Sequence, residues 1–343
     1  KSQPSEMSFS VKNIEDNLEY NGNTLNSLFA QRRNIFRPKF WSIVRDILRF
    51  NKLCKASVKK DQDHGQISLY EFIVANGFSK AFTYNYILPM CAAIWSTSLA
   101  DIKSFPFAFF LKFFHNHGLL NITDRPQWRT LIGGSKQYID PITKGFKDKI
   151  KLNSPVRSVS KVEDQYAVVS GNNTAEIFDE VIFACHSDQA LGMLTNPSSQ
   201  QTDILGAISY GPNEVVLHTD SSVLPKRKLA WASWNYLITG KPDEQQAPIA
   251  LTYNMNILQC LSSNTTFCVT LNNSQDIDPQ KILGRYQYAH PQFSPAAIQA
   301  QTRRGEISGV EGLHFCGAYW YNGFHEDGVR SALDVCHHFG EAL

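Results

Sequence analysis

The sequence predicts an α/β protein of two domains, one holding a parallel sheet and the other built from helices and an antiparallel sheet. Two stretches carry the first part of this prediction. The apolar run 180–185 is typical of a strand buried on both faces of a parallel sheet, and residues 313–340 have the pattern of a strand, a glycine loop and a helix. Residues 213–272 instead alternate strands and turns, as antiparallel sheets do.

The first 120 residues are mainly helical by pattern. Residues 7–11 alternate apolar and polar side chains, which indicates a short strand before the helices. Ser68 and Glu71 have the spacing of a capping box and mark a helix start. Apolar side chains recur on one helical face in each of the helices that we expect, over residues 38–51, 69–75, 81–86 and 107–114.

The rest of the chain contains both the alternating pattern of strands and the helical pattern of apolar residues. Residues 166–170 and 175–178 flank the turn triplet 171–173 and predict a β-hairpin. Further strands are expected over 151–160, 180–185, 214–218, 232–237, 249–255, 267–271 and 313–316. Further helices are expected over 136–147, from residue 187, and over 279–286, 295–301 and 328–342.

Composition excludes several classes of protein. A formal net charge of +2 over 343 residues gives no basic surface for nucleic acid. The seven cysteines form no C-x-x-C, so we expect reduced thiols in a cytoplasmic protein. The aromatic run 105–114 is shorter than the roughly 20 residues that cross a bilayer. We expect a buried helix there, with a substrate tunnel or a peripheral membrane contact as alternatives.

The sequence predicts neither a metal site nor a hydrolase site. Residues 61–71 resemble a calcium loop, but Gln66 stands where glycine is required and Glu71 falls one position early. A loop followed by a helix cap is therefore expected. The adjacent pairs Cys185-His186 and His337-His338 lack the spacing of zinc ligands, and no G-x-S-x-G occurs.

The loop 317–328 is the most informative candidate site. Gly317, Gly323 and Gly328 punctuate it, and a helix follows. Such a junction presents backbone N–H groups and the positive end of a helix dipole to an electron-rich ligand. An ordinary strand-to-helix connection would use glycine in the same way. The opening half of a dinucleotide site, G-x-G-x-x-G after a first strand, does not occur in the sequence.

Stretches along most of the chain resemble the FAD-dependent amine oxidase/desaturase superfamily, in particular a bacterial branch of NAD/FAD-binding, flavin-containing amine oxidoreductases. The resemblance implies FAD as cofactor and the two-domain FAD-binding oxidoreductase fold, with an N-terminally incomplete parallel sheet. The matching stretches are residues 7–11, 28–34, 40–41, 46–51, 88–90, 93–96, 116–120, 125–130, 133–135, 184–191, 231–236 and 323–328.

The same resemblance implies the residues that bind the cofactor. Gly133 and Gly134 match paired glycines that let the chain approach it, and Val156 and Ala184 match positions on its adenosine side. Phe324 and His325 are the nearest counterparts of the amine oxidase aromatic cage, but they are one residue out of register, which weighs against amine oxidation. On the flavin side the resemblance places Gly317, Gly323, Glu326, Asp327, Gly328 and Val329.

The implied domains and activity follow from this resemblance. A FAD-binding domain is expected from residues 1–20, 121–212 and 306–343, and a substrate domain from residues 21–120 and 213–305. The activity implied is transfer of hydride from a small or lipid-like substrate to FAD. No side chain is assigned as acid or base, and the weak candidates for facing the flavin are His325, Tyr319 and Trp320.

Two competing interpretations remain open. Relatives carry a βαβ unit with the glycine fingerprint before the segment that matches residues 7–11, so we expect that unit to be absent here. The chain would then be a non-catalytic fragment, or a subunit that needs a separate N-terminal nucleotide-binding piece, and apolar strand edges and faces would be exposed. The second competing interpretation is a lipid-binding protein that uses residues 105–114.

Overall fold

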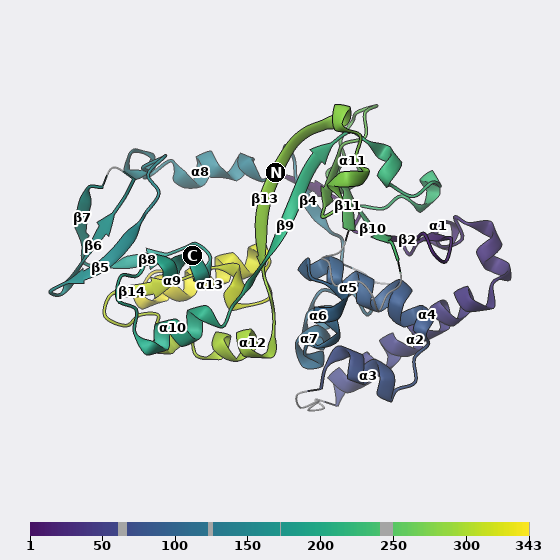
Figure 1. The fold of residues 1–343 in the computed structure, drawn as a ribbon, viewed down its shortest axis with the longest axis horizontal. Coiled ribbons are helices and arrows are strands. Elements are labelled where there is room, and N and C mark those ends of the chain that lie inside the picture. Colours follow the sequence, from purple (N-terminus) through teal and green to yellow (C-terminus); the bar gives the residue numbers. More distant parts are fainter. Residues whose placement is uncertain (61–66, 123–125, 172, 241–249, 343) are drawn as a thin grey trace. The chain divides into compact units, whose positions relative to one another are not determined.

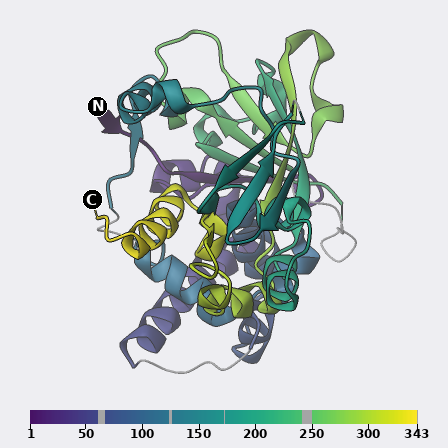
Figure 2. The ribbon, with the colours of Figure 1, turned by 90° about the vertical axis from the view of Figure 1, so that its left-hand side faces the viewer.

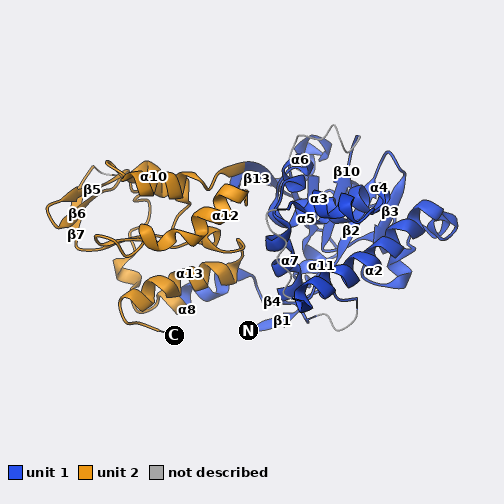
Figure 3. Ribbon diagram, turned by 90° about the horizontal axis from the view of Figure 1, so that it is seen from below, with its two compact units in different colours: residues 1–141, 212–290 blue, residues 142–211, 291–343 orange. Residues whose placement is uncertain are grey.

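Seven strands form the largest sheet of the protein, in the order β13-β9-β12-β11-β10-β2-β3. The structure is a computed structural model that describes residues 1–60, 67–122, 126–171, 173–240 and 250–342. Contacts divide the chain into two units, which are coloured separately in Figure 3. Unit 1 comprises Lys1–Pro141 and Pro212–His290, and unit 2 comprises Ile142–Gly211 and Pro291–Leu343.

The large sheet belongs mainly to unit 1. Strands β2 and β10 run parallel, with Val11 opposite Tyr236, and both of these side chains are buried. The pairs β2–β3, β10–β11, β11–β12 and β12–β9 are antiparallel. The strands are β2 (Phe9–Asn13), β3 (Leu18–Asn21), β9 (Tyr210–His218), β10 (Trp234–Ile238), β11 (Ala250–Asn254), β12 (Cys268–Leu271) and β13 (Ile282–Pro291). A separate antiparallel pair joins β1 (Ser2–Pro4) to β4 (Arg129–Leu131).

The helices of unit 1 contact strands β2, β3, β10 and β11 of the large sheet, most of them from one side (Figure 1). Most of them begin where the sequence supplies a cap or a first-turn proline, such as Ser68 before α3 and Pro38 in α2. They are α1 (Leu25–Leu28), α2 (Pro38–Lys59), α3 (Leu69–Ala75), α4 (Lys80–Phe82), a π-helical turn (Thr83–Ile87), α5 (Leu88–Trp95), α6 (Leu99–Lys103), α7 (Phe107–Asn116) and α11 (Met255–Leu258).

Phenylalanine rings hold these helices together. The ring of Phe50 in α2 lies 5.4 Å from that of Phe82 and 5.7 Å from that of Phe110. Phe72 of α3 stacks on Phe107 of α7, with 3.8 Å between the ring centroids. The buried helix predicted from the aromatic run 105–114 is therefore confirmed. Among the described helices, none is long and apolar enough to cross a bilayer.

Unit 2 contains an antiparallel meander, β5-β6-β7, and a parallel pair, β8 and β14. Figure 2 shows the meander as three adjacent teal arrows and helix α13 in yellow. The buried side chains of Phe183, Phe315 and Trp320 belong to its core. The elements are β5 (Ser158–Val162), β6 (Gln165–Val169), β7 (Ala175–Phe178), β8 (Val181–Phe183), β14 (Leu313–Phe315), α9 (Ser187–Met193), α10 (Ser199–Gly206), α12 (Pro295–Thr302) and α13 (His325–His338).

Short helices connect these elements. Helix α8 (Ile139–Thr143) spans the boundary between the two units. The 3-10 helices are Arg32–Phe36, Ser135–Tyr138, Lys147–Lys149, Ser221–Val223, Lys228–Ala230, Ser274–Asp276, Pro279–Lys281, Arg304–Glu306 and Ala318–Trp320.

Local signals in the sequence predicted many of these elements correctly. The capping box is present: the Glu71 N–H donates to Ser68 Oγ at 3.1 Å and the Ser68 N–H donates to Glu71 Oε2 at 2.7 Å. The predicted hairpin pairs Val169 with Ala175. All seven cysteines are free thiols. Residue 172 of the hairpin turn and residues 61–66 of the calcium-like loop lie outside the described residues.

Three predicted helices differ from the structure. Of residues 279–286 only 279–281 are helical, as a 3-10 turn, because β13 begins at residue 282 and its long-range pairing with β9 outweighs the local pattern. The helix predicted over 136–147 is only two short turns. Residues 83–87 form a π-helical turn, and the hydroxyl of Tyr20 donates to the carbonyl of Asn85 at 2.6 Å.

The predicted burial of β8 on both faces is wrong. The side chain of Ile182, in the middle of this strand, is 51% exposed, whereas that of Phe183 is buried. In the described part of the chain β8 pairs only with β14, so the pair is too small to be covered on both sides. The parallel pairing itself is confirmed, with Phe183 opposite Phe315.

The two units are divided differently from the domains implied by the resemblance. Residues 1–20 and 121–141 lie in unit 1, because β2 pairs with β10 and β1 pairs with β4. Residues 142–211 and 306–343 lie in unit 2. The functional division into a FAD-binding and a substrate domain stays a prediction.

We predict that Phe110→Ala destabilises unit 1 strongly. Loss of a fully buried ring among other phenylalanines should lower the free energy of unfolding by about 3–5 kcal/mol. Phe36, 85% exposed, provides the matched control, and Phe36→Ala should change stability by less than about 0.5 kcal/mol. Urea denaturation measures both, and equal effects would contradict the proposed core.

Candidate functional site

The parallel strands β8 and β14 end at the same edge of unit 2. The N–H of Cys316 donates to the carbonyl of Phe183 at 2.9 Å, so the chain leaves both strands side by side. Ala184 and Gly317 are the residues that follow this contact. Ligands of α/β proteins bind at the carboxyl ends of parallel strands, which makes this edge the candidate site.

The other edge of β14 is hydrogen-bonded within the chain. Leu313 donates its N–H to the carbonyl of Val310 at 3.1 Å and accepts from the N–H of Gly309 at 2.8 Å. Phe315 donates its N–H to Ser308 Oγ at 3.1 Å and accepts from Arg304 Nε at 3.1 Å. The open edge at β14 expected from the competing interpretation is therefore not found, although Ile182 does leave an apolar side chain exposed.

Arg304 joins the strand to the helix that follows it. Besides its bond to Phe315, it donates from Nη2 to the carbonyl of Ser331 at 2.8 Å and from Nη1 to Asp334 Oδ2 at 2.7 Å. Its guanidinium carbon lies 5.5 Å from the centre of the Trp320 ring, within cation–π range. The side chain is only 13% exposed, so these charge-assisted bonds are largely shielded from water.

The loop between β14 and α13 is fixed at both ends. The N–H of Gly317 donates to Ser331 Oγ, and Ser331 Oγ donates to the carbonyl of Gly328, each at 2.8 Å. Gln301 Nε2 donates to the carbonyls of Tyr319 and Tyr321 at 2.8 and 2.7 Å. These bonds come from helices α12 and α13 and hold the loop against the strand edge.

Helix α13 begins three residues earlier than predicted. The N–H of Phe324 donates to Asp327 Oδ2 at 2.9 Å, so Asp327 caps the helix start. The N–H of Gly328 donates to the carbonyl of Phe324 at 3.0 Å, which places Gly328 in the second turn and occupies its amide. The first-turn amides belong to residues 325–327, and these carry the positive end of the dipole.

Two buried polar atoms lie in this loop. In the described part of the chain, neither the hydroxyl of Tyr319 nor Nε1 of Trp320 has a hydrogen-bond partner, although both side chains are over 95% buried. Leaving such a group unpaired costs about 1–3 kcal/mol. The Tyr319 ring lies against Gly317, where a Cβ would be 2.3 Å from Cε1. These orphaned donors indicate that a polar atom of a ligand fits here.

Burial raises the pKa of several titratable side chains around Tyr319. Burial raises the pKa of the Tyr319 phenol and of the thiols of Cys185 and Cys316 above their ordinary values. Burial also raises the pKa of Tyr210, whose ring stacks on His186 at 4.2 Å and whose hydroxyl accepts from the N–H of Ser187 at 3.0 Å. These groups can donate hydrogen bonds, but none is a thiolate or phenolate nucleophile.

The structure brings most of the predicted site residues together in unit 2. Around the strand edge and the start of α13 lie Ala184, Gly317, Gly323, Glu326, Asp327, Gly328 and Val329. Val156 is 39% exposed and precedes β5. Of the weak candidates, Tyr319 and Trp320 are buried and His325 is exposed.

The paired glycines are placed elsewhere. Gly133 and Gly134 follow β4 in unit 1, and both adopt positive φ angles, +80° and +84°, which favour glycine. The sequence analysis missed three residues that shape the site, Gln301, Arg304 and Ser331. Their contacts with the strand, the loop and the following helix reach 11 to 30 residues along the chain, and no local motif signals them.

Comparison with known proteins identifies the fold. A scan against protein-family models and a search of curated proteins find no match. A cyclohexylamine oxidase from Brevibacterium oxydans IH-35A superposes with a TM-score of 0.62 at 10% identity, covering 99% of this chain and 83% of its own. A putative protoporphyrinogen oxidase from Exiguobacterium sp. 255-15 gives 0.62 at 12% identity, covering 99% and 82%.

A third solved structure is a fatty acid isomerase from P. acnes that produces CLA, with a TM-score of 0.61 at 11% identity, covering 98% of this chain and 81% of its own. At such low identity these likenesses show the fold alone. The chain has the α/β fold of FAD-binding oxidoreductases, as the resemblance implied.

We predict that Gly317→Ala destabilises unit 2 through the Tyr319 ring. The added Cβ forces the ring to move, and the free energy of unfolding should fall by about 1–3 kcal/mol. In a Tyr319→Ala background the same change should cost less than about 0.5 kcal/mol. Urea unfolding of the four proteins completes this double-mutant cycle, and an equal cost in both backgrounds would show that the ring is not the cause.

The variant Arg304→Lys tests whether the three hydrogen bonds of Arg304 stabilise unit 2 more than an ordinary surface charge does. Lysine cannot make the three directional bonds of the guanidinium, so we expect a loss of about 1–3 kcal/mol in the stability of unit 2. Arg303, which forms an exposed pair with Glu306, is the adjacent control, and Arg303→Lys should cost less than about 0.5 kcal/mol. Indistinguishable unfolding curves of the two variants would show that the three hydrogen bonds of Arg304 do not stabilise unit 2.

Proposed function

We propose that the protein is a FAD-dependent oxidoreductase whose cofactor binds at the carboxyl edge of β8 and β14. The observation that carries this proposal is the pair of orphaned buried donors in Tyr319 and Trp320, beside the dipole end of α13. A ring system with carbonyl and nitrogen acceptors would satisfy both donors. The fold shared with FAD-binding oxidoreductases supports the same assignment.

The residues at this edge divide into roles. The backbone around Gly317 and Gly323 and the first turn of α13, with Glu326 and Asp327, would hold the flavin, and Gly328 and Val329 extend this contact. Val156 and Ala184 would line the adenosine side. That Gly133 and Gly134 contact the cofactor remains a prediction. When bound, FAD supplies the acceptor for hydride, which amino-acid side chains do not supply.

The substrate is proposed as a small or lipid-like molecule. The names of the similar structures cover an amine oxidase, a putative protoporphyrinogen oxidase and a fatty acid isomerase, so the fold by itself does not choose among these substrates. His325, Tyr319 and Trp320 are proposed to face the flavin ring. Their proposed part in the reaction is orientation, because the sequence assigns no side chain here as an acid or base.

Flavin titration with matched glycine variants tests the cofactor site. A Cβ at Gly328 meets no protein atom within 4 Å, so Gly328→Ala should fold normally. If the cofactor approaches the start of α13, this Cβ should weaken FAD binding about tenfold or more. Gly192 in α9 has the same open surroundings, and Gly192→Ala should bind FAD like the wild type.

Quenching of flavin fluorescence measures both affinities, and thermal unfolding checks that each variant is folded. Saturable binding that Gly328→Ala weakens and Gly192→Ala preserves would support the proposed site. No binding by the wild-type chain, or equal affinity of the two variants, would count against it.

A further inference from the structure

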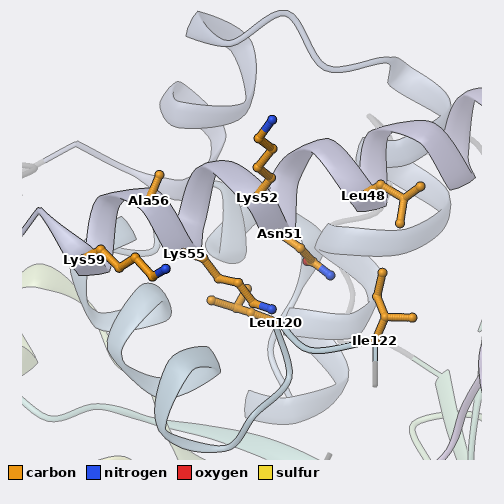
Figure 4. A pocket seen from close by; sticks show the side chains of 8 residues that line it. All are labelled: Leu48, Asn51, Lys52, Lys55, Ala56, Lys59, Leu120 and Ile122. Carbon is orange, nitrogen blue, oxygen red and sulfur yellow. The ribbon is translucent and has the colours of Figure 1, made fainter. Parts of the chain in front are cut away.

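A groove runs along helix α2 in unit 1 (Figure 4). One face of the helix and two residues after α7, Leu120 and Ile122, line it. Its volume is about 500 Å³, within the range of small-molecule pockets. The groove lies in a unit separate from the candidate cofactor site, so it needs an explanation of its own.

Three lysines on this helix line the groove, Lys52, Lys55 and Lys59. Their spacing places them on neighbouring turns. None of the three has an ion pair or a side-chain hydrogen bond to another described residue, whereas Lys39 on the same helix pairs with Asp16 at 2.6 Å. Like charges along a concave surface attract an anion.

The groove has an apolar end as well. Leu48 and Ile122 are 50% and 58% exposed, and both line the groove. In Figure 4 they lie at one end of the helix segment, and Lys59 lies at the other, with Lys55 beside Leu120. The helix rises about 16 Å between residues 48 and 59, at about 1.5 Å per residue. Charge and hydrophobicity are therefore separated along the length of the groove.

We propose that this groove binds one molecule of a long-chain anionic amphiphile. The carboxylate would lie between Lys55 and Lys59, and the acyl chain would lie on the exposed side chains of Leu48 and Ile122. A long-chain carboxylate matches both features, because its charge sits at one end and its apolar surface at the other. The proposal does not depend on FAD and concerns binding alone.

Calorimetric titration with dodecanoate, below its micelle concentration, tests the proposal. The double variant Lys55→Glu/Lys59→Glu should weaken binding about tenfold or more, because it reverses the charge at the head of the ligand. Leu48→Glu should weaken it similarly by removing apolar surface. Exposed residues outside the groove give matched controls, Lys112→Glu/Lys136→Glu and Leu25→Glu, and these should retain wild-type affinity.

Two further ligands separate the possible outcomes. Dodecylammonium has the same chain with the opposite charge and should not bind, and raising the salt concentration should weaken dodecanoate binding. Equal binding of both amphiphiles, or equal loss in the groove and control variants, would overturn the proposal. So would sedimentation with phosphatidylglycerol vesicles in the absence of any dodecanoate binding, because that result would assign the lysines to a membrane surface.

Discussion

The guanidinium of Arg304 is the interaction on which the candidate site depends. It bonds the end of β14, the backbone of α13 at Ser331 and the carboxylate of Asp334, and it lies over the Trp320 ring. Ser331 and Gln301 add hydrogen bonds to the loop, and Arg304 bonds both the strand that precedes the loop and the helix that follows it. Because the loop is held on both sides, the position of Gly317 and the start of α13 are set before any ligand arrives.

Which helices and strands the sequence predicts depends on how far apart along the chain their stabilising contacts lie. The capped helix at Ser68, the hairpin of β6 and β7 and the aromatic helix α7 are set by neighbours in sequence, and all were predicted. The local pattern over residues 279–286 predicts a helix where β13 begins, because the pairing of β13 with β9 lies some seventy residues away along the chain. The sequence pattern places the start of α13 at Gly328. The helix begins earlier, because the side chain of Asp327 accepts a hydrogen bond from the N–H of Phe324 and caps the first turn.

In the candidate site, too, residues close together in sequence could be predicted, and residues that long-range contacts bring together could not. The sequence, with its family resemblance, pointed to Gly317, Gly323 and Asp327, which stand in one continuous loop and helix. Arg304, Ser331 and Gln301 carry no local motif, because the atoms that they bond lie far from them along the chain. The burial of the Tyr319 hydroxyl and the Trp320 indole depends on packing by several elements, and only the structure shows that these donors lack partners.

The hydrogen bonding of β14 limits how unit 2 can associate with other protein chains. A strand at the margin of a sheet usually invites edge-to-edge aggregation. Here residues 304–310 use the outward donors and acceptors of Leu313 and Phe315, so this margin has no free backbone group to template an added strand. The chain thus carries its own protection against β-aggregation at β14, and association there must rely on side-chain contacts.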